Sequence, residues 1–385
     1  MPESPQMNIE FEDIRPYYDS EVVDVLQQLI VDPSFLRFVQ QVVPDLDEDK
    51  VNRLLEDVKT IRGFQEKLMY PLAHGVAQNT TAGITHSGSE KLKRGQGYLF
   101  ISNHRDIILD SAFLNLLLFQ NNMDTCEVAI GSNLLIQPWI KDLVRLNKNF
   151  IVHRNVPAKQ LYEYSLKISN YIRRSIIDRH VSVWIAQREG RTKDGDDRTQ
   201  PGLLKMFTIS GKSSDMVENL NPLNITPLAI SYEYEPCDYL KARETYIKQQ
   251  TGQYKKTVQD DLKSMLQGIE NYKGRVHFAV GTSLEERLKG VELPTNKNDL
   301  IKKIAELIDE EIYRQYHLWP TNYVAYDVLR DVAQYVEMYT PDEKAKFLQH
   351  VDKLAQKAEE PADAIREIIL KMYAAPVENK LNQKR

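Results

Sequence analysis

A histidine and two aspartates follow an apolar run in the segment LFISNHRDIILDSAFLN, residues 99–115. His104 comes directly after LFISN, and Asp106 and Asp110 follow before the chain becomes apolar again. A histidine side chain, with an ordinary pKa of about 6.5, suits general-base catalysis at neutral pH, and a carboxylate on its other ring nitrogen fixes the tautomer. The alternative is a histidine that only caps or packs, which is the commoner role of a single Asn-His pair after a strand.

Three further polar stretches follow runs that are typical of strands. The first is NFIVHR, which ends in Arg154. The second is VSVWIAQREGRTKDG, whose candidate site residues are Glu189, Gly190, Arg191, Thr192 and Lys193. The third is NITPLAISYEYE, in which Pro227 favours an edge or irregular strand. Folds of the α/β class collect ligand-binding groups at the ends of strands, so these stretches are candidates for one site.

The elements that must position these residues fall into three regions. Helical spacing of apolar residues predicts a helical bundle over residues 1–80, including a helix that begins at Pro33 with Asp32 as its cap. Residues 80–97 are rich in Gly, Ser and Thr and indicate a loop or short strands. Strand-like runs at 98–103, 126–131, 150–154, 181–186, 225–234 and 275–281 alternate with helical segments, which predicts an α/β architecture. After residue 296 helices are predicted at 298–318, 324–339, 341–358 and 361–375, and a frayed tail from 378.

The composition excludes several classes of protein. The net charge of -5 gives no reason to expect nucleic acid as a partner. The two cysteines, Cys126 and Cys237, form neither a disulfide framework nor a metal knuckle and favour a reducing compartment. Residues 1–20 are acidic, unlike a secretory signal, and the longest apolar stretch is interrupted by Asp110 and Asn115 and too short to cross a bilayer. We therefore expect a cytoplasmic protein without a membrane span.

Taken in order, NHRDIILD, FIVHR, REGRTKDG and ITPLAISYE resemble the four sequence blocks of the glycerolipid acyltransferases, which include glycerol-3-phosphate and 1-acyl-glycerol-3-phosphate acyltransferases. The resemblance covers residues 85 to about 290. It departs from the family at two places: five residues rather than four separate His104 from Asp110, and the third block is one residue short after Glu-Gly. The resemblance implies an α/β domain over 81–295 with a mixed sheet flanked by helices, between the helical bundle of 1–80 and a helical C-terminal region of 296–385.

The resemblance also implies an activity. It is the transfer of a fatty acyl group from acyl-carrier protein or acyl-CoA to a hydroxyl of glycerol-3-phosphate or 1-acyl-glycerol-3-phosphate in phospholipid biosynthesis, with no cofactor and no metal. His104 would be the general base, and Asp110 its partner with Asp106 as the alternative. Phosphate would be bound by Arg154, Arg191 and Lys193, with Glu189 and Gly190 shaping the turn and Thr192 adding a hydroxyl donor.

Other functions fit part of the pattern. A lyso-aminolipid O-acyltransferase would use the same base without a phosphate, and a catalytically silent lipid-binding protein of the same fold would account for the altered His–Asp spacing. Because the lipid substrates reside in bilayers, we expect peripheral association with the inner face of the membrane. The helix SLKISNYIRRSIIDRH, with Lys167, Arg173, Arg174 and Arg179, either contacts that membrane or packs on the sheet with its basic groups in water.

Overall fold

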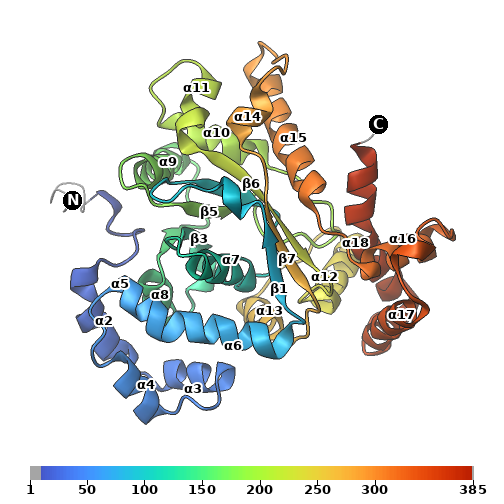
Figure 1. The fold of residues 1–385 in the computed structure, drawn as a ribbon, viewed down its shortest axis with the longest axis horizontal. Coiled ribbons are helices and arrows are strands. Elements are labelled where there is room, and N and C mark those ends of the chain that lie inside the picture. The colour runs from blue at the N-terminus through green and yellow to red at the C-terminus, as the bar shows by residue number, and fades with distance from the viewer. Residues whose placement is uncertain (1–9, 384–385) are drawn as a thin grey trace.

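A seven-stranded sheet runs through the middle of the protein in the computed structural model, which describes residues 10–383 (Figure 1). Its order is β1-β7-β6-β2-β5-β3-β4. The strands are β1 (Ile84–Ser87), β2 (Leu99–Ser102), β3 (Glu127–Gly131), β4 (Asn149–Val152), β5 (Val183–Ala186), β6 (Ile225–Tyr232) and β7 (Val276–Val280).

Helices make up most of the rest of the chain. The α-helices are α2 (Val22–Leu29), α3 (Pro33–Val42), α4 (Glu48–Leu55), α5 (Ile61–Phe64), α6 (Tyr70–Thr80), α7 (Leu109–Gln120), α8 (Pro138–Leu146), α9 (Leu161–Ile177), α10 (Pro201–Ile209), α11 (Met216–Leu220), α12 (Asp238–Thr251), α13 (Val258–Glu270), α14 (Leu284–Leu288), α15 (Lys297–Gln315), α16 (Pro320–Arg330), α17 (Pro341–Gln356) and α18 (Ala362–Asn382). Short 3₁₀ turns are η1 (Asp19–Glu21), η3 (Ser89–Lys91), η4 (Ser132–Leu134), η5 (Asn221–Leu223) and η6 (Val336–Met338), and η2 (Gln65–Met69) is a π-helical turn.

The sheet is mixed. Strands β6, β2, β5, β3 and β4 pair in parallel, whereas β7 is antiparallel to β6 and β1 is parallel to β7. The carboxyl ends of the five parallel strands therefore lie along one edge, where an α/β fold offers its loops to a ligand. The predicted fold class, an α/β fold with a mixed sheet flanked by helices, is confirmed.

Helices cover both faces of the sheet, which is why β2 and β6 read as nearly continuous apolar runs. On one face, α6 and α7 pack against Phe100, Trp184 and Phe278. On the other, α9, α10 and α15 pack against Ile101 and Ile185. The catalytic candidates thus lie at the end of a core that is packed on two sides.

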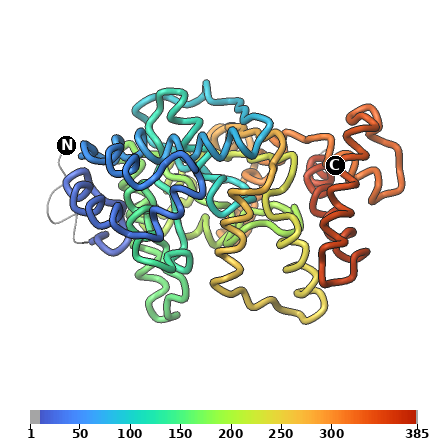
Figure 2. Tube along the Cα trace, turned by 90° about the horizontal axis from the view of Figure 1, so that it is seen from below, coloured from blue at the N-terminus to red at the C-terminus, as the bar shows by residue number. Residues whose placement is uncertain are grey.

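The remaining helices lie at opposite ends of the molecule, as Figure 2 shows. Helices α2 to α6 share an apolar cluster with Leu143 and Leu146 of α8. Helices α16, α17 and α18 share another cluster with Ala242 of α12. The Asp32 carboxylate caps α3 by accepting from the backbone N–H groups of Ser34 and Phe35, which confirms that predicted helix start. The domain boundaries at 80 and 295 stay predictions.

The structure corrects one prediction about strands and confirms another, that of a short strand within residues 80–97. Strand β6 lies between β7 and β2 with all its residues buried, so the edge position inferred from Pro227 was wrong. The carbonyl of Pro227 accepts from Gly281 N just beyond the Leu228–Val280 pair, so the proline nitrogen faces the end of β7 and its missing N–H removes only the reciprocal bond at that end of the ladder. Within residues 80–97, four residues form the edge strand β1.

Two helix predictions in the C-terminal region also needed correction. The helix predicted over 324–339 breaks at Asp331, whose φ is 51°, and only α16 and the short η6 form there. Helix α18 continues to Asn382, so the prediction of a frayed tail from residue 378 was wrong up to residue 382. Residues 384–385 lie outside the described residues. So do residues 1–9, which belong to the segment that was predicted not to be a secretory signal.

Helix α9 packs on the sheet through residues such as Ile172 and Ile176, and its basic side chains bind protein groups. Lys167 pairs with Asp13, Arg174 with Glu10 and Arg179 with Glu127, while Arg173 donates to the carbonyls of Phe207 and Asn219. A membrane-facing role for this helix therefore finds no support. Between residues 10 and 383 there is also no helix with the length and apolarity that crossing a bilayer requires.

Candidate active site

The loop between β2 and α7 begins with an anchored asparagine. The Asn103 side chain donates to Ile230 O at 2.9 Å and accepts from Ile230 N at 2.8 Å, so it pairs with β6 in the manner of another strand. This buried double hydrogen bond holds the backbone on the amino-terminal side of His104. The position of His104 is thus set by the end of the central strands.

His104 and Asp110 form a dyad. Nδ1 of His104 lies 2.8 Å from Oδ2 of Asp110, and the imidazole packs edge-on against Trp184. The His104 side chain keeps 14% of its surface exposed, whereas that of Asp110 is fully buried. Among residues 10–383, no group hydrogen-bonds to Nε2 of His104, which leaves that nitrogen available to a substrate.

Asp110 is held by three further donors. The backbone N–H groups of Arg105 and Asp106 donate to Oδ2 at 2.6 and 3.1 Å, and the Tyr232 hydroxyl donates to Oδ1 at 3.0 Å. Burial, and then the nearby Asp110 carboxylate, raise the pKa of Tyr232 well above its ordinary value, so this hydroxyl remains a donor. A carboxylate with its acceptor positions filled in this way orients the imidazole firmly.

Asp106, the alternative partner, does not contact His104 but caps α7. Its Oδ1 accepts from Ile108 N at 2.9 Å and from Leu109 N at 2.8 Å. A Cβ added to Gly268 of α13 would lie 2.2 Å from Oδ2, so Asp106 points towards that helix. Burial, and then Asp110, raise the pKa of Asp106. The geometry therefore assigns the contact with His104 to Asp110.

The third sequence block, residues 188–195, contacts the loop that contains His104. Thr192 N donates to the carbonyl of His104 at 3.0 Å, and the turn before it uses Gly190 at φ 72°, a conformation that glycine adopts readily. The Arg191 side chain lies beside Asp106 and Cys237 and is only 5% exposed. Its NH1 has no hydrogen-bond partner among the described residues.

The other predicted cationic residues lie at the rim with carboxylate partners. Lys193 Nζ lies 3.1 Å from Glu244, and burial lowers its pKa. Arg154 NH1 lies 2.6 Å from Glu189, which joins the second and third blocks. The structure thus brings all the predicted residues to one edge of the sheet, but Arg191 alone among these cations is buried with an unpaired nitrogen.

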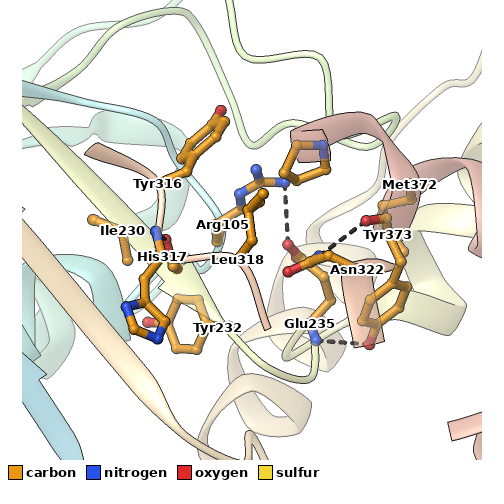
Figure 3. Close-up of a pocket in the computed structure, with 12 residues that line it drawn as sticks. Arg105, Ile230, Tyr232, Glu235, Tyr316, His317, Leu318, Asn322, Met372 and Tyr373 are labelled. Atoms are coloured by element: carbon orange, nitrogen blue, oxygen red, sulfur yellow. Dashed lines mark hydrogen bonds and ion pairs between the residues drawn. The ribbon is translucent and has the colours of Figure 1, made fainter. Parts of the chain in front are cut away.

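The sequence analysis did not identify the interior groups that hold the loop between β2 and α7. Arg105 forms ion pairs with Asp197 and Glu235, and the hydroxyl of Tyr316 donates to Asp197. Figure 3 shows Arg105 and Glu235 in a pocket lined also by Tyr316 and Tyr373. Arg105 lies inside the first block and Asp197 follows the third block by two residues, so their charges in and beside these blocks were the available signal. No sequence signal pointed to the two tyrosines.

Comparison with known proteins bears on these blocks. The family model described as Acyltransferase matches residues 83–227, a span that contains the dyad and the second and third blocks. Residues 83–227 are thus similar to this acyltransferase family. The match supports the glycerolipid acyltransferase enzyme predicted from the four blocks. Among curated proteins, none matches the chain.

A solved structure similar to this acyltransferase is the 1-acyl-sn-glycerophosphate (LPA) acyltransferase PlsC from Thermotoga maritima. The two sequences are 14% identical, the TM-score is 0.33, and the similarity covers 77% of this chain and 93% of that chain. In the described part of the acyltransferase, residues 10–383, no group of three or more His, Cys, Asp or Glu residues could hold a metal ion.

Proposed function

We propose that the acyltransferase moves a fatty acyl group from acyl-CoA or acyl-carrier protein to a hydroxyl of glycerol-3-phosphate or 1-acyl-glycerol-3-phosphate, in phospholipid biosynthesis. The observation that carries the proposal is the His104–Asp110 dyad, whose Nε2 is unpaired among the described residues, together with a buried Arg191 that has an unpaired nitrogen and precedes Thr192, which bonds to the carbonyl of His104. A base and an anion site lie together at the edge where the five parallel strands end. A phosphorylated alcohol as acceptor needs a base for its hydroxyl proton and a cation for its phosphate.

The proposed reaction needs no covalent enzyme intermediate. Nε2 of His104 takes the proton of the acceptor hydroxyl while its oxygen attacks the thioester carbonyl. The tetrahedral adduct collapses, the carbon–sulfur bond breaks, and the proton passes from His104 to the departing thiolate. Asp110 stabilises the imidazolium between these steps. The reaction balances with an ester and a thiol as products and requires no cofactor.

The acceptor is the part of the proposal on which Arg191 bears. A buried guanidinium nitrogen without a partner is unusual because desolvating it costs free energy that a bound anion would recover. Arginine also binds phosphate through paired N–H groups. This supports a phosphorylated acceptor over a lyso-aminolipid without phosphate. Lys193 and Arg154, whose carboxylate partners are only partly buried, would contact the same phosphate from the rim.

A silent lipid-binding protein is the less favoured alternative. The extra residue between His104 and Asp110 was its best support, yet the two side chains hydrogen-bond at 2.8 Å. Peripheral association with the inner face of the membrane remains part of the proposal, because the lipid acceptor and product reside in bilayers.

The proposed function is tested by incubating the purified protein with palmitoyl-CoA or palmitoyl-carrier protein and, separately, glycerol-3-phosphate, 1-acyl-glycerol-3-phosphate and a lyso-aminolipid. We expect an acylated product with a phosphorylated acceptor from the wild type and none from His104→Ala. If His104→Ala is as active as the wild type, the assignment of His104 as the base is overturned. If a product forms with the lyso-aminolipid alone, the phosphorylated acceptor is overturned and the lyso-aminolipid takes its place.

Arg191→Gln tests the phosphate site in the same assay. We expect the KM of the phosphorylated acceptor to rise by about 10-fold or more, because one charge-assisted contact to phosphate contributes about 1.5–3 kcal/mol, while the KM of the acyl donor stays within about 2-fold. The matched control is Arg198→Gln, in the same loop, whose side chain is 73% exposed and pairs with Asp196. A similar rise in both variants would contradict the site.

A further inference from the structure

We propose that Arg105 is a positioning residue, which holds the catalytic loop by two buried ion pairs that are themselves held by the C-terminal helices. The inference rests on the proposed role of His104 as the base. Arg105 follows His104 directly, and its backbone N–H donates to Asp110 Oδ2 at 2.6 Å. One residue thus joins the dyad through its backbone and the protein interior through its side chain.

The Arg105 guanidinium bridges two acidic residues from distant segments. Its NH2 lies 2.5 Å from Asp197 Oδ2, in the loop after β5, and its NH1 lies 3.1 Å from Glu235 Oε1, after β6. The residue is 3% exposed. Burial alone would lower the pKa of Arg105, but the two carboxylates raise it above its ordinary value. Arg105 is therefore a permanent cation at the junction of three loops.

Asp197 closes a ring of contacts around the dyad. The Thr192 hydroxyl donates to Asp197 Oδ1 at 2.6 Å, and Thr192 N donates to the carbonyl of His104 at 3.0 Å. The ring runs from His104 to Arg105, Asp197 and Thr192 and returns to His104. Each member fixes the next, so the backbone on both sides of the catalytic imidazole is tied to the third block.

The C-terminal region supplies the outer supports. The Tyr316 hydroxyl donates to the Asp197 carboxylate and that of Tyr313 to the Asp197 carbonyl. On the other branch, Glu235 N donates to the hydroxyl of Tyr373 of α18 at 2.8 Å. Figure 3 shows this second branch, with the Arg105 guanidinium pointing at Glu235 and Glu235 bonded to the hydroxyl of Tyr373.

Among residues 10–383, none of the hydrogen bonds and ion pairs of Arg105, Asp197 and Glu235 involves Nε2 of His104, so we expect the network to act on the dyad and not on the substrates. The consequence is kinetic: loosening the network displaces His104 and Asp110 relative to a bound acceptor. A misplacement of about 1 Å at a catalytic group can lower the rate by about 100-fold. We therefore expect kcat to fall while both KM values remain.

The experiment uses the full-length protein with Arg105→Lys and Tyr316→Phe. Arg105→Lys keeps the buried positive charge, but an ammonium group lacks the planar set of N–H donors with which the guanidinium binds both carboxylates. Tyr316→Phe removes one hydroxyl and little volume. The control is Tyr339→Phe, which removes a hydroxyl that donates to Asp327 at 2.9 Å, elsewhere in the C-terminal region. We expect kcat to fall by about 10-fold or more in Arg105→Lys and by a few-fold in Tyr316→Phe, with KM within about 2-fold and Tyr339→Phe at the wild-type kcat.

The outcomes separate this inference from the proposed function. If Arg105→Lys or Tyr316→Phe loses thermal stability but keeps its kcat at a temperature where it is folded, the network is purely structural and the inference is overturned. A rise in KM without a change in kcat would overturn it as well. If His104→Ala is as active as the wild type, the proposed function fails, whatever Arg105 does.

Discussion

At the scale of single residues, His104 and Asp110 form their hydrogen bond across five intervening residues because two carboxylates, those of Asp106 and Asp110, hold the backbone of the loop between them. Asp110 accepts from the N–H groups of Arg105 and Asp106, while Asp106 accepts from those of Ile108 and Leu109. The additional residue between His104 and Asp110 is absorbed in this doubly bonded turn. The contact of 2.8 Å between the two side chains is retained.

Asp110→Asn and Asp106→Asn should therefore differ sharply. We expect Asp110→Asn to lower kcat by about 10²–10⁴-fold, since an amide group neither stabilises the imidazolium nor selects the right tautomer. Asp106→Asn keeps an oxygen for the N–H groups at the start of α7 and should stay within about 3-fold of the wild type. Steady-state kinetics on both variants, after their folding is checked by circular dichroism, makes the comparison. An equal loss in both would contradict the assignment of Asp110.

At the scale of elements, α15 joins the third block to the sheet. Asp309 on α15 accepts from the N–H and the hydroxyl of Thr199 at 2.8 and 2.6 Å, just before α10. Burial raises the pKa of Asp309 to about 7. A carboxyl group whose pKa is raised by folding stabilises the protein fully below its unfolded pKa and loses that contribution as the pH rises through the folded value.

Asp309→Asn should remove this dependence on pH. An amide oxygen still accepts from Thr199 and never ionises, so we expect the variant to gain free energy of unfolding over the wild type as the pH rises from about 4 to about 7. Above that range the gain should stay constant, on the order of 4 kcal/mol. Urea unfolding of both proteins at pH 5, 6 and 8 measures it. A constant difference at all three values of pH would argue against an Asp309 that titrates in this range.

The elements that sequence periodicity predicted are those with buried faces. The strand-like runs ending near Ser102 and Ala186 form β2 and β5 because apolar residues alternate between two covered faces. Strand β1 carries mostly exposed residues and pairs with β7; the composition of residues 80–97 allowed a short strand there, but no local pattern reveals its partner. In the site, His104 and Asp110 are close in sequence and were predicted as partners. Tyr316 reaches Asp197 only through tertiary packing, so its part could not be predicted.

At the scale of the whole molecule, the two helical ends are joined to the sheet in different ways. The N-terminal helices share apolar contacts with α8, through Leu143 and Leu146. The C-terminal helices share theirs with α12 and also reach the catalytic loop through polar groups. The N-terminal end therefore contributes to stability, whereas the C-terminal end contributes to both stability and site geometry.

Phe64→Ala tests how the N-terminal end is joined. Phe64 is fully buried in the cluster shared with α8, and its truncation should lower the free energy of unfolding by about 3–5 kcal/mol. Because the cluster includes residues of α8, we expect one unfolding transition and an unchanged specific activity while the protein is folded. Val31→Ala, at a side chain that is 71% exposed, should change stability by less than about 0.5 kcal/mol. Calorimetry that resolves a separate early transition in Phe64→Ala would contradict this coupling.

The ring around Arg105 also has a consequence for synthesis of the protein on the ribosome. The dyad residues emerge within a single turn of each other, but Tyr316 and Tyr373, which support Arg105, emerge only after all seven strands of the sheet. Contacts between distant parts of the chain form after the local ones. A nascent chain with its sheet already folded would therefore carry the dyad on an unsupported loop, and full activity would begin only when α18 has left the ribosome and docked.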